Sequence, residues 1–171
     1  SEIYLDEDHP RPGLLGAAAS LGMTDYARCL VFNSLSKRSN AAGLRSGFVA
    51  GDAAVLAEFC RYRSYHGCAM PRHHQAASIA AWRDEDHVVE NRARYREKLA
   101  AVLPILAPVL PTPRPPAGFF LWPETPARDE EVFVRHLFQT AGVRALPGRY
   151  LGQDTAGGNP GQGRMRLALV P

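Results

Sequence analysis

The sequence lacks the features that mark membrane, secreted or nucleic-acid-binding proteins. It contains no apolar run of about 18 residues, so no transmembrane helix is expected, and no signal peptide is visible. The formal net charge is only +3, which is too weak to indicate a nucleic-acid partner. With 46% apolar and 22% charged residues, the composition predicts a globular protein, which we expect in the cytoplasm.

Cysteine and histidine are too sparse and too irregularly spaced to build a metal centre. The three cysteines are odd in number, and their spacings match no disulfide or zinc framework. They are Cys29, Cys60 and Cys68, and we interpret them as free thiols. No Cys-x-x-Cys or His-Glu-x-x-His motif accompanies the histidines, so no bound metal is predicted.

Lysine is the scarce basic residue. Among the 20 basic residues only Lys37 and Lys98 are lysines. Arginine stays protonated, whereas a lysine amine can lose its proton and attack a carbonyl. A lysine retained in a sequence that otherwise uses arginine for positive charge therefore points to chemistry that arginine does not perform. Lys98 lies beside the apolar stripe of a predicted helix and is interpreted as a surface residue, which leaves Lys37 as the candidate.

The candidate lysine is predicted to lie between two strands. Residues 29–35 have the pattern of a buried strand, residues 36–43 that of a polar loop, and residues 46–50 that of a second short strand. Helical spacing follows over 53–65 and resumes over 75–82.

The second half predicts a long helix followed by a smaller α+β portion. The helix spans 84–106, with one apolar stripe and with acidic residues at its start, where the helix dipole favours them. The six prolines of 104–116 fit either a linker or a rigid turn, and the core-like strand 118–122 that follows at once favours the turn. The remaining predicted elements are strands over 143–146 and 164–170 and a helix over 129–140, with Val132, Phe133, His136 and Leu137 inward and Asp129 and Gly142 as its caps.

Reactive side chains gather just after the first predicted strand. Ser34 and Ser36 precede Lys37, and Arg45 follows it eight residues later. Pyridoxal phosphate (PLP) needs such a set, because a lysine amine forms an imine with its aldehyde while hydroxyls and a bidentate arginine bind its phosphate. The segment also fits Ser-x-x-Lys of penicillin-recognising serine enzymes, but their Lys-Thr-Gly and Ser-Asp-Asn are missing. An ordinary surface lysine is the remaining alternative.

This segment resembles the lysine signature of the class I and II (fold type I) aminotransferases. That signature runs Ser-x-Ser-Lys, two residues, a small residue, two further residues, then Gly-x-Arg-x-Gly. The matching positions are Ser34, Ser36, Lys37, Asn40, Gly43, Arg45 and Gly47. Ser46 departs from the pattern, since the family usually has an apolar residue there, and this concerns local packing more than chemistry. The resemblance implies that Lys37 is the catalytic, PLP-binding residue and that Ser34, Ser36 and Arg45 also bind the cofactor.

The resemblance extends to the last predicted strand. The run Gly-Arg-Met-Arg-Leu-Ala-Leu-Val over 163–170 is similar to the family's final strand, in which an Arg followed by Leu or Ile binds the substrate α-carboxylate. This pattern implies substrate binding by Arg166. Arg164 lies on the same strand face, so only the Arg-Leu step separates the two. Pairing of Arg166 with a surface acid is the alternative.

The resemblance covers essentially the whole chain and implies an α/β fold. Residues 1–84 would be the C-terminal part of an incomplete fold type I PLP-binding large domain, and 85–171 most of the small α+β domain without its last helix. Because the chain starts without Met and both ends lie in apolar segments, we expect an internal fragment. The Asp that pairs with the pyridinium nitrogen and the Tyr that contacts the ring hydroxyl are then expected upstream of Ser1. Fold type I sites form between subunits, which implies a homodimer.

Several stretches are most similar to the N-succinyldiaminopimelate aminotransferases of bacterial lysine synthesis. They are residues 1–7, 34–40, 62–70 and 75–82. The similarity implies amino transfer between an amino acid, glutamate, and a 2-oxo acid, N-succinyl-2-amino-6-oxopimelate. The alternatives are another fold type I PLP enzyme, such as a different aminotransferase or a C–S lyase, and a PLP-binding transcription regulator. No membrane or nucleic-acid partner is expected.

Overall fold

The structure is a computed structural model that describes residues 3–5 and 13–170. It forms two compact units, Ser1–Arg92 and Ala93–Pro171. Parts of the stretch 1–7 that enters the resemblance lie outside the described residues. The predicted boundary near residue 85 assigns the chain to a large and a small domain of the full protein, and it stays a prediction.

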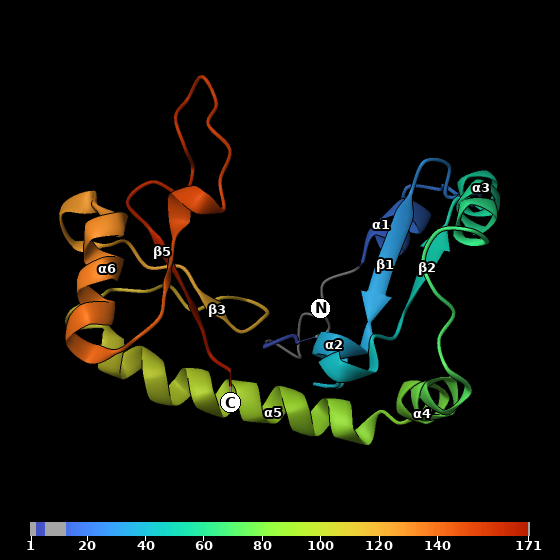
Figure 1. Ribbon diagram of the computed structural model, residues 1–171, viewed down its shortest axis with the longest axis horizontal. Coiled ribbons are helices and arrows are strands. Elements are labelled where there is room, and N and C mark those ends of the chain that lie inside the picture. Colours follow the sequence, from blue (N-terminus) through green and yellow to red (C-terminus); the bar gives the residue numbers. More distant parts are fainter. Residues whose placement is uncertain (1–2, 6–12, 171) are drawn as a thin grey trace. The chain divides into compact units, whose positions relative to one another are not determined.

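The first unit is built around a two-stranded antiparallel ribbon flanked by helices (Figure 1). Its elements are α1 Leu14–Ser20, β1 Leu30–Ser34, α2 Leu35–Arg38, η1 Ala42–Leu44, β2 Gly47–Gly51, α3 Ala53–Arg63, α4 Arg72–Arg83 and the first turns of α5 Asp86–Leu106. The ladder runs from Leu30 opposite Gly51 to Ser34 opposite Gly47. The two strands therefore meet at the end from which α2 starts.

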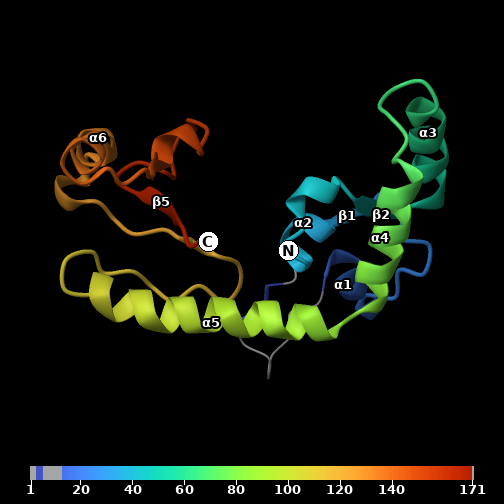
Figure 2. The ribbon, with the colours of Figure 1, turned by 60° about the horizontal axis from the view of Figure 1, so that its bottom comes forward.

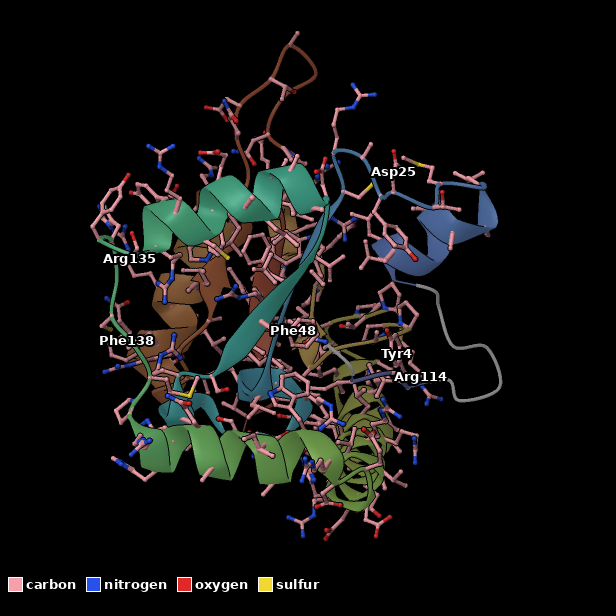
Figure 3. All side chains as sticks on the ribbon, turned by 90° about the vertical axis from the view of Figure 1, so that its right-hand side faces the viewer. Tyr4, Asp25, Phe48, Arg114, Arg135 and Phe138 are labelled. Carbon is pink, nitrogen blue, oxygen red and sulfur yellow. The ribbon has the colours of Figure 1, made fainter. Side chains whose placement is uncertain are left out.

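Aromatic side chains of the ribbon contact the helices beside it. Phe48 of β2 makes an edge contact with Trp82 of α4, with ring centroids 5.1 Å apart, and Phe32 of β1 makes one with Phe59 of α3. Figure 3 shows Phe48 on its strand, with α3 on one side and α4 on the other. Figure 2 shows α4 standing alongside the ribbon and α2.

The predicted loop over 36–43 is wrong in its first half. Leu35 closes the strand in the prediction, but it opens α2 in the structure, and Lys37 lies on that short helix. Ser34 has extended backbone angles and its hydroxyl accepts the N–H of Ser36, which is the geometry of an N-cap. The cap starts a helix inside a run of polar residues, where periodicity gives no signal.

The second unit packs α6 Glu130–Ala141 against a three-stranded antiparallel sheet (Figure 1). The sheet has the order β3-β5-β4, with β5 in the centre. Its strands and short helices are β3 Phe120–Leu121, η2 Pro126–Arg128, β4 Leu146–Pro147, η3 Gly148–Tyr150 and β5 Met165–Ala168. Leu110, Val134 and Met165 form its buried cluster. The mixed α/β pattern that the sequence predicts is confirmed.

The predicted inward face of α6 is partly wrong. Val132 is 63% exposed and His136 is also exposed, whereas Val134 is buried. The predicted caps are confirmed, because Asp129 accepts the N–H of Val132 and Gly142 ends the helix in the left-handed conformation at φ 66°. The helix is thus rotated so that Val134 faces Leu110 and Met165.

Helix α5 follows its predicted stripe. Val88, Tyr95 and Leu99 are almost fully buried, and Asp86 lies in the first turn. Pro104 lies inside the last turn, and the helix ends at Leu106 before the remaining prolines. None of the described helices is long and apolar enough to cross a membrane.

Candidate functional site

The pairing of β1 with β2 brings the candidate residues into one short connection. Ser34 is opposite Gly47, so the chain between them leaves and returns at the same end of the ribbon. Leu35 N–H donates to the Ser46 carbonyl at 3.1 Å, which continues the contact past the last ladder pair. Lys37 and Arg45 both lie in this connection.

The two serine hydroxyls of the motif are in contact. Ser34 Oγ lies 3.0 Å from Ser36 Oγ and donates to the Ser46 carbonyl at 2.9 Å. Ser46 is almost fully buried, and its carbonyl thereby accepts from both Ser34 and Leu35. The departure from the signature at this position leaves the backbone contact intact, since the carbonyl and not the side chain makes it.

Lys37 lies on an exposed position of a helix that is anchored on either side of it. Leu35 is fully buried and Arg38 is 3% exposed. Arg38 donates to the Ala81 carbonyl at 3.0 Å, pairs with Glu85, and lies over the Trp82 ring. These contacts hold the helix against α4 while the Lys37 side chain extends from an exposed position.

The carbonyl end of α2 is held by side chains from α5. Asn91 Nδ2 lies 3.4 Å from the Lys37 carbonyl and 3.3 Å from the Arg38 carbonyl. His87 contacts Ser39 Oγ through Nε2 and Asp84 through Nδ1, each at 2.8 Å. The hydrogen bond from His87 holds the pKa of the Asp84 carboxyl below its usual range. The last carbonyls of this short helix thus have side-chain partners.

Arg45 has a backbone conformation that few non-glycine residues adopt. It lies in the left-handed region at φ 49°, and its Nη1 donates to the Ala42 carbonyl at 3.0 Å. Such a conformation costs about 1–2 kcal/mol, and its persistence indicates that the surrounding turn imposes it. The guanidinium has five N–H donors, so most of them stay available to an anion.

A pocket of about 410 Å³ lies on the ribbon next to Ser34. Its lining residues are Phe32, Asn33, Ser34, Gly47, Phe48, Val49, Phe59 and Arg63. Ser34 is the one residue of the predicted site among them. The walls combine apolar side chains with the polar groups of Asn33, Ser34 and Arg63.

The two arginines of β5 differ in their partners. Arg164 pairs with Glu124 at 2.7 Å and donates to the Trp122 carbonyl at 3.2 Å. Arg166 lies over the Phe120 ring, 4.6 Å from its centroid, and within the described part of the chain no acidic side chain pairs with it. The sequence left open that Arg166 pairs with a surface acid. In the structure it is Arg164 that makes such a pair. Among the described residues, the Arg166 guanidinium thus contacts an aromatic ring and no carboxylate.

The structure therefore brings Ser34, Ser36, Lys37 and Arg45 into one connection of the first unit, while Arg166 lies in the second unit. A primary amine, two hydroxyls and a guanidinium carried by one connection are the groups that bind a phosphorylated carbonyl compound. Sequence reasoning missed Arg38 and Asn91, which anchor α2. No local pattern signals them, because their partners lie far away in the sequence.

The chain is similar to known proteins over nearly its whole length. The family model for aminotransferase class I and II matches residues 9–171. The chain is 31% identical to an LL-diaminopimelate aminotransferase of Nitratidesulfovibrio vulgaris over 99% of its own length and 42% of that protein.

Solved structures are similar to the chain over nearly its whole length as well. A crystal structure of an aminotransferase from Neisseria meningitidis is 53% identical, with a TM-score of 0.91, and the match covers all of this chain and 43% of that one. An alpha-aminoadipate aminotransferase from Thermus thermophilus, complexed with N-(5'-phosphopyridoxyl)-L-leucine, is 25% identical, with a TM-score of 0.80, over 98% of this chain and 42% of that one. The chain thus spans less than half the length of these relatives.

Proposed function

The chain belongs to the aminotransferase class I and II family, and from that premise we propose that the whole protein is a PLP-dependent aminotransferase. The observation that carries the proposal is the gathering of Ser34, Ser36, Lys37 and Arg45 between two paired strand ends. The relative that was solved with a phosphopyridoxyl adduct supports PLP as the cofactor.

The donor set fits the cofactor. PLP carries a dianionic phosphate and an aldehyde, and these call for hydrogen-bond donors and a primary amine. The adjacent hydroxyls of Ser34 and Ser36 and the spare N–H groups of Arg45 would hold the phosphate. Lys37, on the exposed side of an anchored helix, would bind the aldehyde carbon.

Within this assignment Arg166 and Lys37 act on the substrate. When bound, PLP supplies an aldehyde that takes up the substrate amine and a ring that accepts electron density from the α-carbon. Arg166 holds the substrate α-carboxylate and so orients the α-carbon. The Lys37 amine removes the proton from the α-carbon and delivers a proton at C4′ of the cofactor.

We further propose that the substrates belong to lysine synthesis. The named relative acts on LL-diaminopimelate, which supports an amino acid of this kind without distinguishing the succinylated form. The proposed pair is glutamate and N-succinyl-2-amino-6-oxopimelate. A cytoplasmic homodimer is the proposed assembly, and it rests on the family resemblance.

The test uses the full-length protein. Glutamate formation from 2-oxoglutarate is measured with N-succinyl-LL-diaminopimelate and with LL-diaminopimelate as amino donors. A clear preference for the succinylated donor is expected. A preference for LL-diaminopimelate would support the aminotransferase activity but contradict the proposed substrate. No amino transfer from either donor would contradict the proposed activity.

A further inference from the structure

The second unit contains a fully buried carboxylate. Glu130 is 0% exposed, although it is the first residue of α6. Its Oε1 accepts from Arg149 Nε at 2.5 Å, and its Oε2 accepts from the backbone N–H of Gly163 at 2.7 Å. Both oxygens are therefore occupied, and the hydrogen bond from Arg149 leads the causes that lower the pKa of Glu130 to about 2.

Glu130 joins three segments that are distant in sequence. It lies at the start of α6, Arg149 lies in η3, and Gly163 precedes β5. The Gly163 carbonyl is held in turn by Thr125, whose N–H and hydroxyl donate at 2.9 Å and 3.2 Å. The N–H of Gly163 is thus bonded to Glu130, and its carbonyl is bonded to Thr125.

The backbone that follows Gly163 is fixed at each step up to Arg166. The Arg164 carbonyl accepts from Gly148 N–H at 2.7 Å, and Met165 N–H donates to the Pro123 carbonyl at 3.1 Å. Arg166 is then opposite Leu146 in the ladder between β5 and β4. Glu130 binds the N–H of Gly163, the residue at which this series begins, and the antiparallel bridge between Glu124 and Arg164 follows directly after it.

Stability alone gives a weak reason for burying Glu130, whose partner Arg149 keeps 39% of its side chain exposed. Removing a carboxylate from water costs free energy that its hydrogen bonds have to offset. A buried carboxylate with both oxygens bonded can instead fix one geometry. Here the geometry that is fixed is the start of the strand that carries Arg166.

We propose that Glu130 is a positioning residue for substrate binding, which fixes Gly163 so that Arg166 meets the substrate carboxylate. This inference rests on the proposed role of Arg166. Glu130 itself, being fully buried, does not touch substrate.

The test compares Glu130→Gln with Glu131→Gln in the full-length, PLP-loaded protein. Glu131 is the matched control, because it also contacts Arg149, at 3.3 Å, but is part-exposed and has no bond to Gly163. Calorimetry measures the affinity for glutarate, a dicarboxylate without an amine to transfer, and kinetics with glutamate separates KM from kcat. For E130Q we expect a loss of about tenfold or more in glutarate affinity and a matching rise in KM, and for E131Q a change within about twofold.

If E130Q binds glutarate as the wild type does, or only lowers the melting temperature, Glu130 is merely structural and the inference fails. If the wild type transfers no amino group but E130Q still loses glutarate affinity, the proposed function fails and the positioning role stands. If the wild type binds no glutarate, the inference fails with the role of Arg166. Arg149→Lys, which keeps the positive charge, serves if E130Q does not fold, and it should lose less affinity than Arg149→Met.

Discussion

At the scale of single residues, the site depends on groups whose backbone is held while their side chains stay accessible. Leu35 and Arg38 anchor α2 by burial, and Asn91 binds the carbonyl of Lys37 itself. Arg45 is held in a left-handed conformation. Preorganisation of this kind lowers the entropic cost of binding a ligand.

Replacing Lys37 tests the chemical assignment directly. In the full-length protein, Lys37→Ala should abolish amino transfer and remove the absorbance of the lysine-bound cofactor, because Lys37 is the residue proposed to supply the amine. Lys98→Ala is the control, since Lys98 lies over the Tyr95 ring of α5 and has no proposed chemical role. Turnover by K37A near the wild-type rate would falsify the assignment.

The two arginines should separate cofactor binding from substrate binding. Arg45→Ala should weaken PLP binding more than Arg166→Ala does, because each lost charge-assisted hydrogen bond is worth about 1.5–3 kcal/mol. Titration of both apo-proteins with PLP measures the difference. Equal affinities, or the opposite order, would contradict the roles given to these residues.

The low pKa of Glu130 predicts how its contribution to stability depends on pH. A carboxyl whose pKa falls from 4.5 in the unfolded chain to about 2 in the folded one stabilises the fold above pH 4.5. That contribution, about 3 kcal/mol, is lost as the pH falls toward 2. Urea unfolding at pH 6 and pH 2.5 should show a gap between wild type and Glu130→Gln that narrows at the lower pH. A gap that stays constant would mean that Arg149 does not lower this pKa.

At the scale of elements, the sequence predicts most of the helices and strands, and the errors have physical causes. The strand before Lys37 and the apolar stripe of α5 are both found, but no residue of β1 is buried, although the apolar run predicts a buried strand. Helix α2 was not predicted, because a serine cap starts it within a polar run. The grouping of Ser34 with Lys37 follows from the motif. The anchoring by Asn91 depends on tertiary contacts that no local pattern reveals.

The rotation of α6 gives a test at this scale. Val134→Ala should lower the free energy of unfolding by about 2 kcal/mol, because it removes buried methyl groups beside Leu110 and Met165. Val132→Ala, at a 63% exposed position that the sequence predicted to be inward, should change it by less than about 0.5 kcal/mol. Urea denaturation of both variants in the full-length protein measures the difference. Similar losses for the two would restore the predicted face.

At the scale of the whole molecule, residues 1–171 correspond to less than half of the relatives they match. The ribbon of the first unit has two strands, and isolated two-stranded ribbons are marginally stable in water. Phe32 is 68% exposed and Phe48 47% exposed on it. Apolar side chains and unpaired strand edges of this kind favour aggregation when nothing covers them.

Expressed alone, residues 1–171 should therefore have no aminotransferase activity, even with excess PLP. The lysine is present, but these residues span less than half the length of the relatives, and the Asp and Tyr proposed to contact the cofactor ring are expected outside them. Size-exclusion chromatography, the absorbance of bound PLP and an amino-transfer assay check this. A monomeric and active product would show that these residues form a complete site.

The antiparallel pairing of β1 with β2 also bears on the order in which the chain folds. The two strands are separated only by the short connection that holds Lys37 and Arg45, so the entropy lost in closing this loop is small. Contacts between neighbouring stretches form faster than contacts between distant ones. The turn that carries Lys37 is therefore expected to close early, during synthesis on the ribosome, before the strand of Arg166 has been made.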